Sequence, residues 1–374
     1  MINFKNIFSQ NLYQSIVDLN EIFVKHNFEI RIVGGCIRDI LSNCLQKDMD
    51  IDIATNANPS EIRKIFLHNE RIFIKNLGGE SHGTLLLIDV KYDKKFEITT
   101  CRKDVKTFGR FAKVEFTRDF YEDSCRRDFT VNAIYCDING KIYDYHSGID
   151  DLKNKKIRFI GDARTRIHED YLRIIRYFRF CNIFATFDDE NIDICKNLAH
   201  NLSIVSISRL RIELLKMLKF NSYETLNLMT NSGIFNFFEV TVNPKLILKI
   251  ENLSKNIFKY INFKKENIKL IAMFFDIKNI DFVNNNFSNV EKNIFKLAIN
   301  NEYNFITLFA KFGLEKTIEI LMLTSKNVEN EFHDILKIKD LKLPKVDISN
   351  LHGNEISKYI LKDKIEKYEN ILKN

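Results

Sequence analysis

The chain has no tryptophan, and its seven cysteines are an odd number without a CxxC pair. An odd count without paired spacing argues against a disulfide framework and against a zinc ribbon. The eight histidines show no HExxH spacing, and His333-Asp334 is an isolated pair that we expect at the surface. The sequence therefore predicts reduced thiols.

Long apolar runs are also missing. No stretch of the sequence reaches the roughly 20 apolar residues that a membrane helix needs. The segment 1–19 lacks the unbroken apolar region of a signal peptide. We therefore expect a soluble, cytoplasmic protein without a membrane segment. The formal net charge of +7 is compatible with a polyanionic partner but does not demand one.

Glycine is scarce in the later part of the chain. Nine of the twelve glycines lie at or before Gly161, and only Gly233, Gly313 and Gly353 follow. Glycine marks tight turns and close approaches of the backbone to a ligand. The distribution therefore predicts a turn-rich α/β first part followed mostly by helices. A chain of 374 residues suggests two to four domains.

Alternating apolar and polar residues predict strands in the first part, and apolar residues at helical spacing predict helices later. Helices are expected to begin at Gly34-Gly35 and at Asn58-Pro59. The charged segment 101–117 is expected to be irregular and in part a mobile loop. Strands are expected over 28–33, 49–54, 72–77, 84–90 and 95–100, and later helices over 171–180 and 210–218.

The segment 47–53 is the most informative in the chain. In a strand the side chains alternate between faces, so Asp48, Asp50 and Asp52 point to the face opposite the apolar residues. Three like charges on one face repel one another, and a divalent cation removes that repulsion. Carboxylates suit Mg²⁺, which also binds substrate phosphates. Two Mg²⁺ ions about 3.5–4 Å apart can hold both oxygens of an in-line displacement.

A pair of acids with this spacing is common on solvated edge strands, so the preceding turn matters. Gly34-Gly35 lies shortly before the acids, between a predicted strand and a predicted helix. Glycines there let backbone N–H groups approach a triphosphate, and a helix N-terminus favours the anion. A third acid is expected on a neighbouring strand. Glu97 alternates in the right sense, although an ordinary exposed strand glutamate explains it equally well.

With these residues the chain resembles the nucleotidyltransferase superfamily of DNA polymerase β type. Within it, the chain is similar to the class II CCA-adding enzymes and the bacterial poly(A) polymerases. The family motif Gly-Gly-x-x-Arg-Asp corresponds to residues 34–39, and Asp-x-Asp-x-Ala-Thr corresponds to 50–55. Aligning the second motif selects Asp50 and Asp52 as catalytic metal ligands and leaves Asp48 as an extra acid.

The family motif Arg-Arg-Asp-Phe-Thr-x-Asn-Ala is complete at residues 126–133. From the residues alone, this segment would be a helix start with Asp128 in the first turn. In the family, the motif helps to bind the nucleotide sugar and phosphate. Together with the first motif, the resemblance implies nucleotide-binding roles for Gly34, Gly35, Arg38, Arg126, Arg127, Asp128 and Asn132.

Two further motifs follow in order. The hinge motif Asp-x-x-Gly-Gly-x-x-Asp-Leu occurs at 144–152, with Ser147 in place of the first glycine. The motif Glu-Asp-x-x-Arg-x-x-Arg occurs at 169–176, where Asp170 and Arg173 are near neighbours on a helix. An ion pair on an exposed helix is the alternative. The resemblance implies that Asp170 and Arg173 read the base of CTP or ATP. It further implies phosphate contacts for Arg176 and Arg179.

Two segments favour the CCA-adding branch. His82-Gly83-Thr84 and the Thr-Thr-x-Arg-x-Asp pattern within 98–104 are similar to that branch, whereas Phe108-Gly109-Arg110 departs from a more usual Asp-Gly-Arg. The implied activity is addition of CCA to tRNA 3′ ends from CTP and ATP. A poly(A) polymerase, an enzyme adding only CC or only A, and a catalytically silent tRNA-binding protein remain as alternatives.

The resemblance implies an α+β fold in which a polymerase-β-like head, with a mixed sheet and helices, precedes an all-α neck, body and tail. Mg²⁺ is the implied cofactor, and tRNA, CTP and ATP are the implied partners, without an evident obligate protein partner. The expected domains are a catalytic head over 1–145, a nucleotide-selecting neck over 146–205, a body over 206–270 and a tRNA-binding tail over 271–374.

Overall fold

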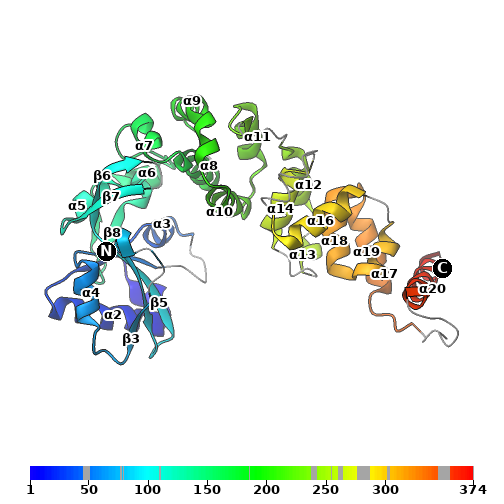
Figure 1. Cartoon of the computed structure of the whole chain (residues 1–374), viewed down its shortest axis with the longest axis horizontal. Coiled ribbons are helices and arrows are strands. Elements are labelled where there is room, and N and C mark those ends of the chain that lie inside the picture. The colour runs from blue at the N-terminus through cyan, green and yellow to red at the C-terminus, as the bar shows by residue number, and fades with distance from the viewer. Residues whose placement is uncertain are drawn as a thin grey trace. The chain divides into compact units, whose positions relative to one another are not determined.

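The chain forms two compact units, Met1–Leu198 and Ala199–Asn374. The first holds two β-sheets with helices, and the described part of the second is helical (Figure 1). This confirms the expected α+β fold with helical later segments. The computed structural model describes residues 1–44, 51–75, 78, 80–108, 111–184, 186–236, 242–253, 255–259, 264–275, 287–300, 304–343 and 354–373.

The main sheet of the first unit has seven strands in the order β3-β4-β5-β2-β1-β8-β9. Neighbouring strands pair antiparallel except β2 and β5, which run parallel, so the sheet is mixed as expected. The strand expected over 49–54 is described only from Asp52, because residues 45–50 lie outside the described part. The strands are β1 Ile30–Val33, β2 Asp52–Thr55, β3 Ile72–Lys75, β4 Thr84–Asp89, β5 Lys94–Thr100, β8 Ile134–Cys136 and β9 Ile142–Asp144.

The core of the first unit joins this sheet to helices α2 (Gln10–Lys25), α3 (Gly35–Leu41) and α4 (Pro59–Ile65). Alternation along β5 buries Phe96 and Ile98 and leaves Glu97 between them exposed, as the period of a strand dictates. Each fully buried large apolar side chain contributes about 1.5–3 kcal/mol. Helix α4 begins with the capping box of Asn58 and Glu61, which explains why that helix was predictable.

A second sheet pairs β6 (Arg102–Phe108) with β7 (Phe111–Phe116) as an antiparallel ribbon. The expectation of an irregular segment over 101–117 is therefore wrong. The register shifts between Asp104 and Lys106, and such a bulge interrupts the alternation by which a strand is recognised in sequence. Gly109 and Arg110 lie outside the described residues.

Short helices complete the first unit. Helix α8 buries Leu172, Ile175 and Phe178 on one face, as the helical spacing predicted. An isolated antiparallel bridge joins Phe129 to Phe159, which lies between α6 (Gly148–Lys153) and α7 (Ala163–Glu169). This bridge ties the 126–133 segment to the helices that follow. The remaining elements are α1 Phe4–Ile7, η1 Glu80–His82, α5 Phe120–Cys125, η2 Thr130–Asn132, α6 Gly148–Lys153, α7 Ala163–Glu169, α8 Leu172–Phe184 and α9 Asp189–Leu198.

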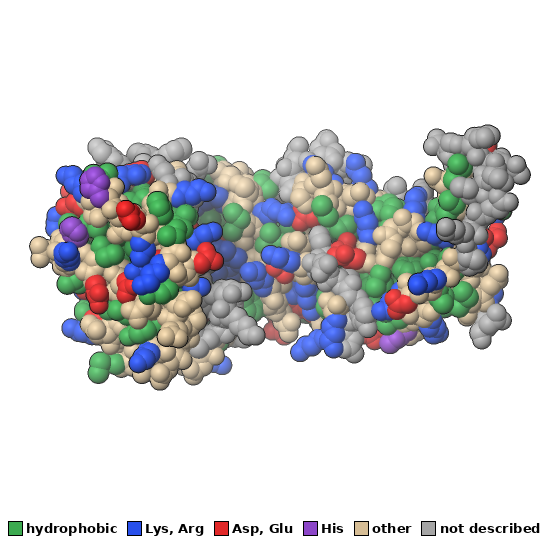
Figure 2. All heavy atoms as spheres, turned by 90° about the horizontal axis from the view of Figure 1, so that it is seen from below, with side chains coloured by type: hydrophobic (Ala, Val, Ile, Leu, Met, Phe, Trp, Pro, Cys, Tyr) green, Lys and Arg blue, Asp and Glu red, His purple; other side chains and the backbone are tan. Residues whose placement is uncertain are grey.

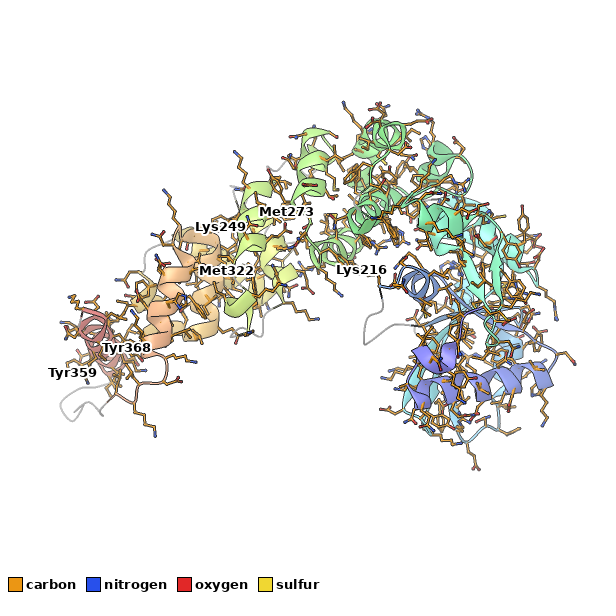
Figure 3. The ribbon with its side chains drawn as sticks, turned by 180° about the vertical axis from the view of Figure 1, so that it is seen from behind. Lys216, Lys249, Met273, Met322, Tyr359 and Tyr368 are labelled. Carbon is orange, nitrogen blue, oxygen red and sulfur yellow. The ribbon has the colours of Figure 1, made fainter. Side chains whose placement is uncertain are left out.

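The second unit buries apolar faces of successive helices against one another. Met273 and Met322 are buried among these helices, and Tyr368 of the last helix packs its ring 5.4 Å from that of Phe309 (Figure 3). The helices are η3 Ala199–Ile204, α10 Ile207–Leu218, α11 Tyr223–Asn231, α12 Pro244–Asn252, α13 Lys255–Phe258, α14 Lys265–Met273, α16 Asn289–Asn300, α17 Phe305–Phe312, α18 Leu314–Thr324, α19 Val328–Ile338 and α20 Asn354–Lys373.

Among the helices that the structure describes, none combines the length and apolar character that crossing a membrane requires. All seven cysteines are free thiols, and five of them are buried. The division into head, neck, body and tail stays a prediction.

Candidate active site

The double-glycine turn joins β1 to α3 beside the first residue of β2. Val33 pairs with Asp52 across the two strands, and Gly34 follows with φ of +76°. A Cβ atom at Gly34 would lie 3.8 Å from Oδ2 of Asp52 and 3.8 Å from Nη1 of Arg127. Glycine is required here because of its positive φ. A side chain would also contact both a carboxylate and a guanidinium group.

Two of the three predicted catalytic acids meet on adjacent strands. Asp52 and Glu97 are partners in the parallel register of β2 and β5, and both residues are exposed. As register partners on neighbouring parallel strands, Asp52 and Glu97 point to the same face of the sheet, and Asp52 lies beside the Gly34 turn. Asp50, the other predicted metal ligand, and Asp48 lie outside the described residues.

The donors present suit a hard divalent cation. Carboxylate oxygens are the ligands that Mg²⁺ prefers, and Asp52 and Glu97 supply them where a triphosphate could share the ion. Within the described ranges, which omit Asp50, no group of three or more Asp, Glu, His or Cys residues is gathered tightly enough to hold a metal.

A buried carboxylate organises the two arginines of the 126–133 motif. Asp123 accepts from Nε of Arg126 at 2.8 Å, from Nη2 of Arg127 at 3.2 Å and from the hydroxyl of Tyr135 at 2.6 Å. Burial alone would raise the pKa of Asp123, but the guanidinium groups of Arg127 and Arg126 lower it to about 2. Asp123 is therefore an anion throughout the neutral range.

A chain of hydrogen bonds links the double-glycine turn to α8. Nη1 of Arg38 donates to Oδ1 of Asn132 at 2.7 Å, and Nδ2 of Asn132 donates to Oδ1 of Asp128 at 3.1 Å. Nε of Arg176 donates to the other Asp128 oxygen at 2.7 Å. All four residues were predicted to bind nucleotide, and the structure brings them together in one network.

The network also shows why Asp128 is ionised. Burial opposes its charge, but Arg176 and the hydrogen bond from Asn132 lower the pKa of Asp128 to about 2. The expectation from the residues alone, a helix with Asp128 in its first turn, is wrong. Asp128 precedes the short 3₁₀ turn Thr130–Asn132, and its carboxylate accepts from the backbone N–H of Phe129.

The expectation that Asp170 and Arg173 share one helix is wrong: Asp170 is an extended residue at the end of α7, and Arg173 lies in the first turn of α8. Oδ1 of Asp170 accepts from the backbone N–H of Leu172 at 3.2 Å. Arg173 is only 9% exposed, and its Nη1 donates to Glu169 and to the carbonyl of Arg166, each at 2.5 Å. The guanidinium carbon of Arg179 lies 4.0 Å from the centre of the Phe180 ring.

Sequence reasoning missed the residues that hold the motif in place. Nη2 of Arg166 donates to the carbonyls of Arg126 and Arg127 at 2.6 and 2.9 Å. Asp123 precedes those arginines by three and four positions, a spacing that signals possible ion pairs. Arg166 also pairs locally with Glu169, but no local pattern reveals its contacts with the 126–133 motif, because those are backbone carbonyls 39 and 40 residues away.

Comparison with known proteins gives a consistent family. Residues 30–158 match the model of the poly A polymerase head domain, and 186–242 match that of the probable RNA and SrmB-binding site of polymerase A. The CCA-adding enzyme of Lactococcus lactis (strain IL1403) is 33% identical over 310 residues, which span 80% of this chain and 75% of that enzyme. The chain belongs to the CCA-adding enzyme family.

Another relative carries the name of a tRNA nucleotidyltransferase. The human mitochondrial CCA tRNA nucleotidyltransferase 1 is 38% identical over 280 residues, or 74% of this chain. The matched stretch spans only 62% of the human protein's length.

Solved structures confirm the fold of this CCA-adding enzyme family member. The Bacillus stearothermophilus CCA-adding enzyme in complex with CTP covers 98% of the chain with a TM-score of 0.70 at 19% identity. The Thermotoga maritima CCA-adding enzyme complexed with tRNA_CCA has a TM-score of 0.68 at 21% identity. The double-glycine turn, the acids and the 126–133 motif all lie within the matched head domain. Asp170 and Arg173, which were predicted to read the base, fall between the two matched regions.

Proposed function

We propose that this protein completes tRNA 3′ ends by adding C, C and A from CTP and ATP. The observation that supports the proposal most directly is at Gly34, where Oδ2 of Asp52 and Nη1 of Arg127 each lie 3.8 Å from the position of a Cβ atom. A nucleoside triphosphate needs a carboxylate that binds its metal ion and a cation that binds its phosphates. Asp52 and Arg127 supply these two groups at the same point.

The reaction joins the tRNA 3′ oxygen to the α-phosphorus of the incoming nucleotide. The bond from the α-phosphorus to its bridging oxygen breaks, pyrophosphate leaves, and the 3′-hydroxyl proton is released. Mg²⁺ held by Asp50 and Asp52, with Glu97 as the third candidate ligand, would lower the pKa of that hydroxyl and neutralise the leaving pyrophosphate.

The chain's own residues place the substrate. Arg38 and Arg127 lie at the turn and are proposed to bind the triphosphate, with Gly34 and Gly35 leaving room for it. Asn132, Asp128 and Arg176 hold Arg38 through the hydrogen-bond network. Because the network is built from charged hydrogen bonds, it fixes geometry before substrate arrives.

Base choice is proposed to lie with Asp170 and Arg173. A carboxylate accepts from the exocyclic amine that cytosine and adenine share, and a guanidinium donates to ring or carbonyl acceptors. Uracil and guanine would leave these groups unpaired, which costs more than a good pair gains. Arg126 and Arg179 are proposed to contribute further phosphate contacts.

The second unit is proposed to bind tRNA. The match of residues 186–242 to a probable RNA-binding region supports this. So does the exposed side of α10, where Lys216 and Lys219 lie near the exposed apolar side chains of Ile212 and Phe220. The proposed partners are therefore tRNA, CTP and ATP. A cytoplasmic location and the lack of an obligate protein partner stay predictions.

A tRNA lacking its 3′ CCA tests the proposal. It is given with CTP alone, with ATP alone and with both, and products are resolved on a sequencing gel. Two added nucleotides with CTP and three with both are expected. A long ladder with ATP would instead indicate a poly(A) polymerase. No extension, with Asp52→Ala indistinguishable from the unmodified protein, would indicate a silent binding protein.

A further inference from the structure

We propose that Asp123 is a positioning residue that aims Arg127 at the triphosphate, an inference that rests on the nucleotide site proposed above. Asp123 is 1% exposed, and its carboxylate accepts hydrogen bonds from Arg126 and Arg127. Besides Arg126, Arg127 and Tyr135, its carboxylate accepts from the backbone N–H of Arg102 at 3.2 Å. Four donors meet a carboxylate that has about four acceptor positions. The group is saturated, so it can orient its neighbours but is not available for substrate.

The three nitrogens of the Arg127 guanidinium have different surroundings. Nε donates to the hydroxyl of Tyr135 at 2.9 Å, and Nη2 donates to Asp123. Nη1 is the atom that lies toward the turn, 3.8 Å from the Cβ position of Gly34. Because the guanidinium is planar and rigid, holding two nitrogens fixes the direction of the third. That third nitrogen faces the place proposed for the triphosphate.

Asp123 also joins this arginine to the second sheet. Arg102 is the first residue of β6, and its backbone N–H is one of the four donors to Asp123. The carboxylate thus fixes the start of the β6–β7 ribbon and the orientation of Arg127 at the same point. A residue with only a structural role would affect stability, whereas a positioning residue also affects the phosphate contact.

The first test compares binding of CTP and CMP to the full chain by calorimetry. Asp123→Asn keeps the shape but removes the charge, and Arg127 loses its firm orientation. The affinity for CTP is expected to fall about tenfold, while the affinity for CMP changes much less. In turnover, the KM for CTP is expected to rise more than kcat falls. Equal losses for CTP and CMP would overturn the proposal.

A matched control and a second variant keep the test decisive. Asp89 is equally buried, but its carboxylate accepts from Arg71 and Ser15 instead. Asp89→Asn is expected to lower stability without changing the ratio of CTP to CMP affinity. Tyr135→Phe removes the partner of Nε and keeps Asp123. It is expected to shift the same ratio in the same direction, and it decides the matter if Asp123→Asn does not fold.

A double-mutant cycle shows whether the effect passes through Arg127. In an Arg127→Ala background, Asp123→Asn is expected to lower CTP affinity much less than it does in the unmodified protein, because Arg127 is gone and only Arg126 is still oriented by Asp123. Additive losses would overturn the proposal. Since CTP binding is measured apart from tRNA extension, a protein that binds CTP in this pattern but adds no CCA contradicts only the proposed function.

Discussion

The guanidinium group of Arg173 is fixed before any nucleotide arrives. Glu169 and the carbonyl of Arg166 accept from one of its nitrogens, and the carbonyl of Arg126 lies 3.4 Å from another. This rigidity suits a group that has to distinguish bases by hydrogen-bond direction. The contact with Arg126 also connects Arg173 to the backbone of the 126–133 motif.

Arg173→Ala is therefore expected to impair nucleotide choice more than triphosphate affinity. Discrimination of CTP against UTP should fall about 10- to 100-fold, because the base loses a charged donor while the phosphate ligands remain. Misincorporation assays with each nucleotide measure this. Arg164→Ala, at an exposed position of α7, serves as the control. Equal loss of choice and affinity would contradict the base-reading role.

At the scale of single residues, the sequence predicted those site residues that a pattern of a few neighbouring positions identifies. The double-glycine turn and Asp52 were found because a turn and an alternating strand are visible over a few positions. Asp123 and Arg166 were missed as organisers of the site. Their partners include a tyrosine hydroxyl and distant backbone carbonyls, which no local spacing reveals.

Among the elements, α6 begins at a departure from the family motif, because Ser147 replaces the first glycine at its N-terminus. Ser147 adopts a left-handed conformation with φ of +59° and ψ of 34°. Asp144 accepts from the backbone N–H groups of Gly148 and Ile149, both at 2.8 Å, and so holds the turn. A left-handed residue other than glycine is disfavoured by roughly 1–2 kcal/mol, which the capping interaction offsets here.

Ser147→Gly is expected to raise the free energy of unfolding by about 0.5–1 kcal/mol, since relief of strain exceeds the added flexibility of glycine. Gly148→Ala is expected to lower it by about 1–3 kcal/mol. Its Cβ would lie 2.3 Å from the carbonyl oxygen of Thr130. Thermal unfolding of both variants measures the contrast. A destabilising Ser147→Gly would show that the serine side chain itself is needed.

Helix α18 carries a buried acid in the second unit. Glu319 is 4% exposed. Burial and the nearby Glu315 raise the pKa of Glu319 to about 7, while Lys316 opposes the shift. The folded chain therefore holds this proton more tightly than the unfolded chain. The resulting stabilisation is present below the unfolded pKa of 4.5 and is lost as the pH rises through about 7.

The unfolding free energy of the second unit is therefore expected to fall by about 2–3 kcal/mol between pH 5 and pH 8 from this group. Glu319→Gln should remove that part of the pH dependence, whereas Glu329→Gln, at an exposed position of α19, should retain it. Denaturant unfolding followed by circular dichroism at both pH values gives the comparison. An unchanged pH dependence in Glu319→Gln would contradict the assignment.

Elements were predictable where their ends carry strong signals. The capping box at Asn58 marked α4, and the apolar spacing over 171–180 marked α8. The β6–β7 ribbon was not predictable, because its charged residues and its bulge hide the alternation. Its pairing depends on contacts between the strands and not on the pattern within each strand.

For the whole molecule, glycine distribution predicted the change from a mixed α/β part to helices, but it could not predict how the helices of the second unit pack. Lysine and arginine side chains are distributed over both units on the face shown in Figure 2, mixed with apolar and acidic ones. The proposed RNA contact is therefore argued from one helix and not from a continuous basic face. In the second unit, Lys216 is exposed on α10 (Figure 3), Ile212 one turn earlier is 52% exposed, and Phe220, two residues after the helix, is 39% exposed.

Lys216→Glu combined with Lys219→Glu is expected to weaken tRNA binding, because phosphate contacts are lost and repulsion is added. The slope of log affinity against log salt should become shallower by about 0.7–0.9 for each lost phosphate contact. CTP binding without tRNA should not change. Lys25→Glu on α2 is the control, at an exposed position of the first unit. Filter binding across a salt series measures all three proteins, and an unchanged slope would exclude α10 from the tRNA surface.

Asp50 and Asp52 are proposed to hold paired metal ions beside a triphosphate at the double-glycine turn. Anomalous diffraction from crystals containing Mn²⁺ and a non-hydrolysable CTP analogue tests it most directly. Two peaks about 3.5–4 Å apart next to Asp52 are predicted, with the triphosphate against Gly34 and Nη1 of Arg127, and both peaks should vanish in Asp52→Asn. Peaks remote from Asp52, or a nucleotide bound away from this turn, would contradict the account.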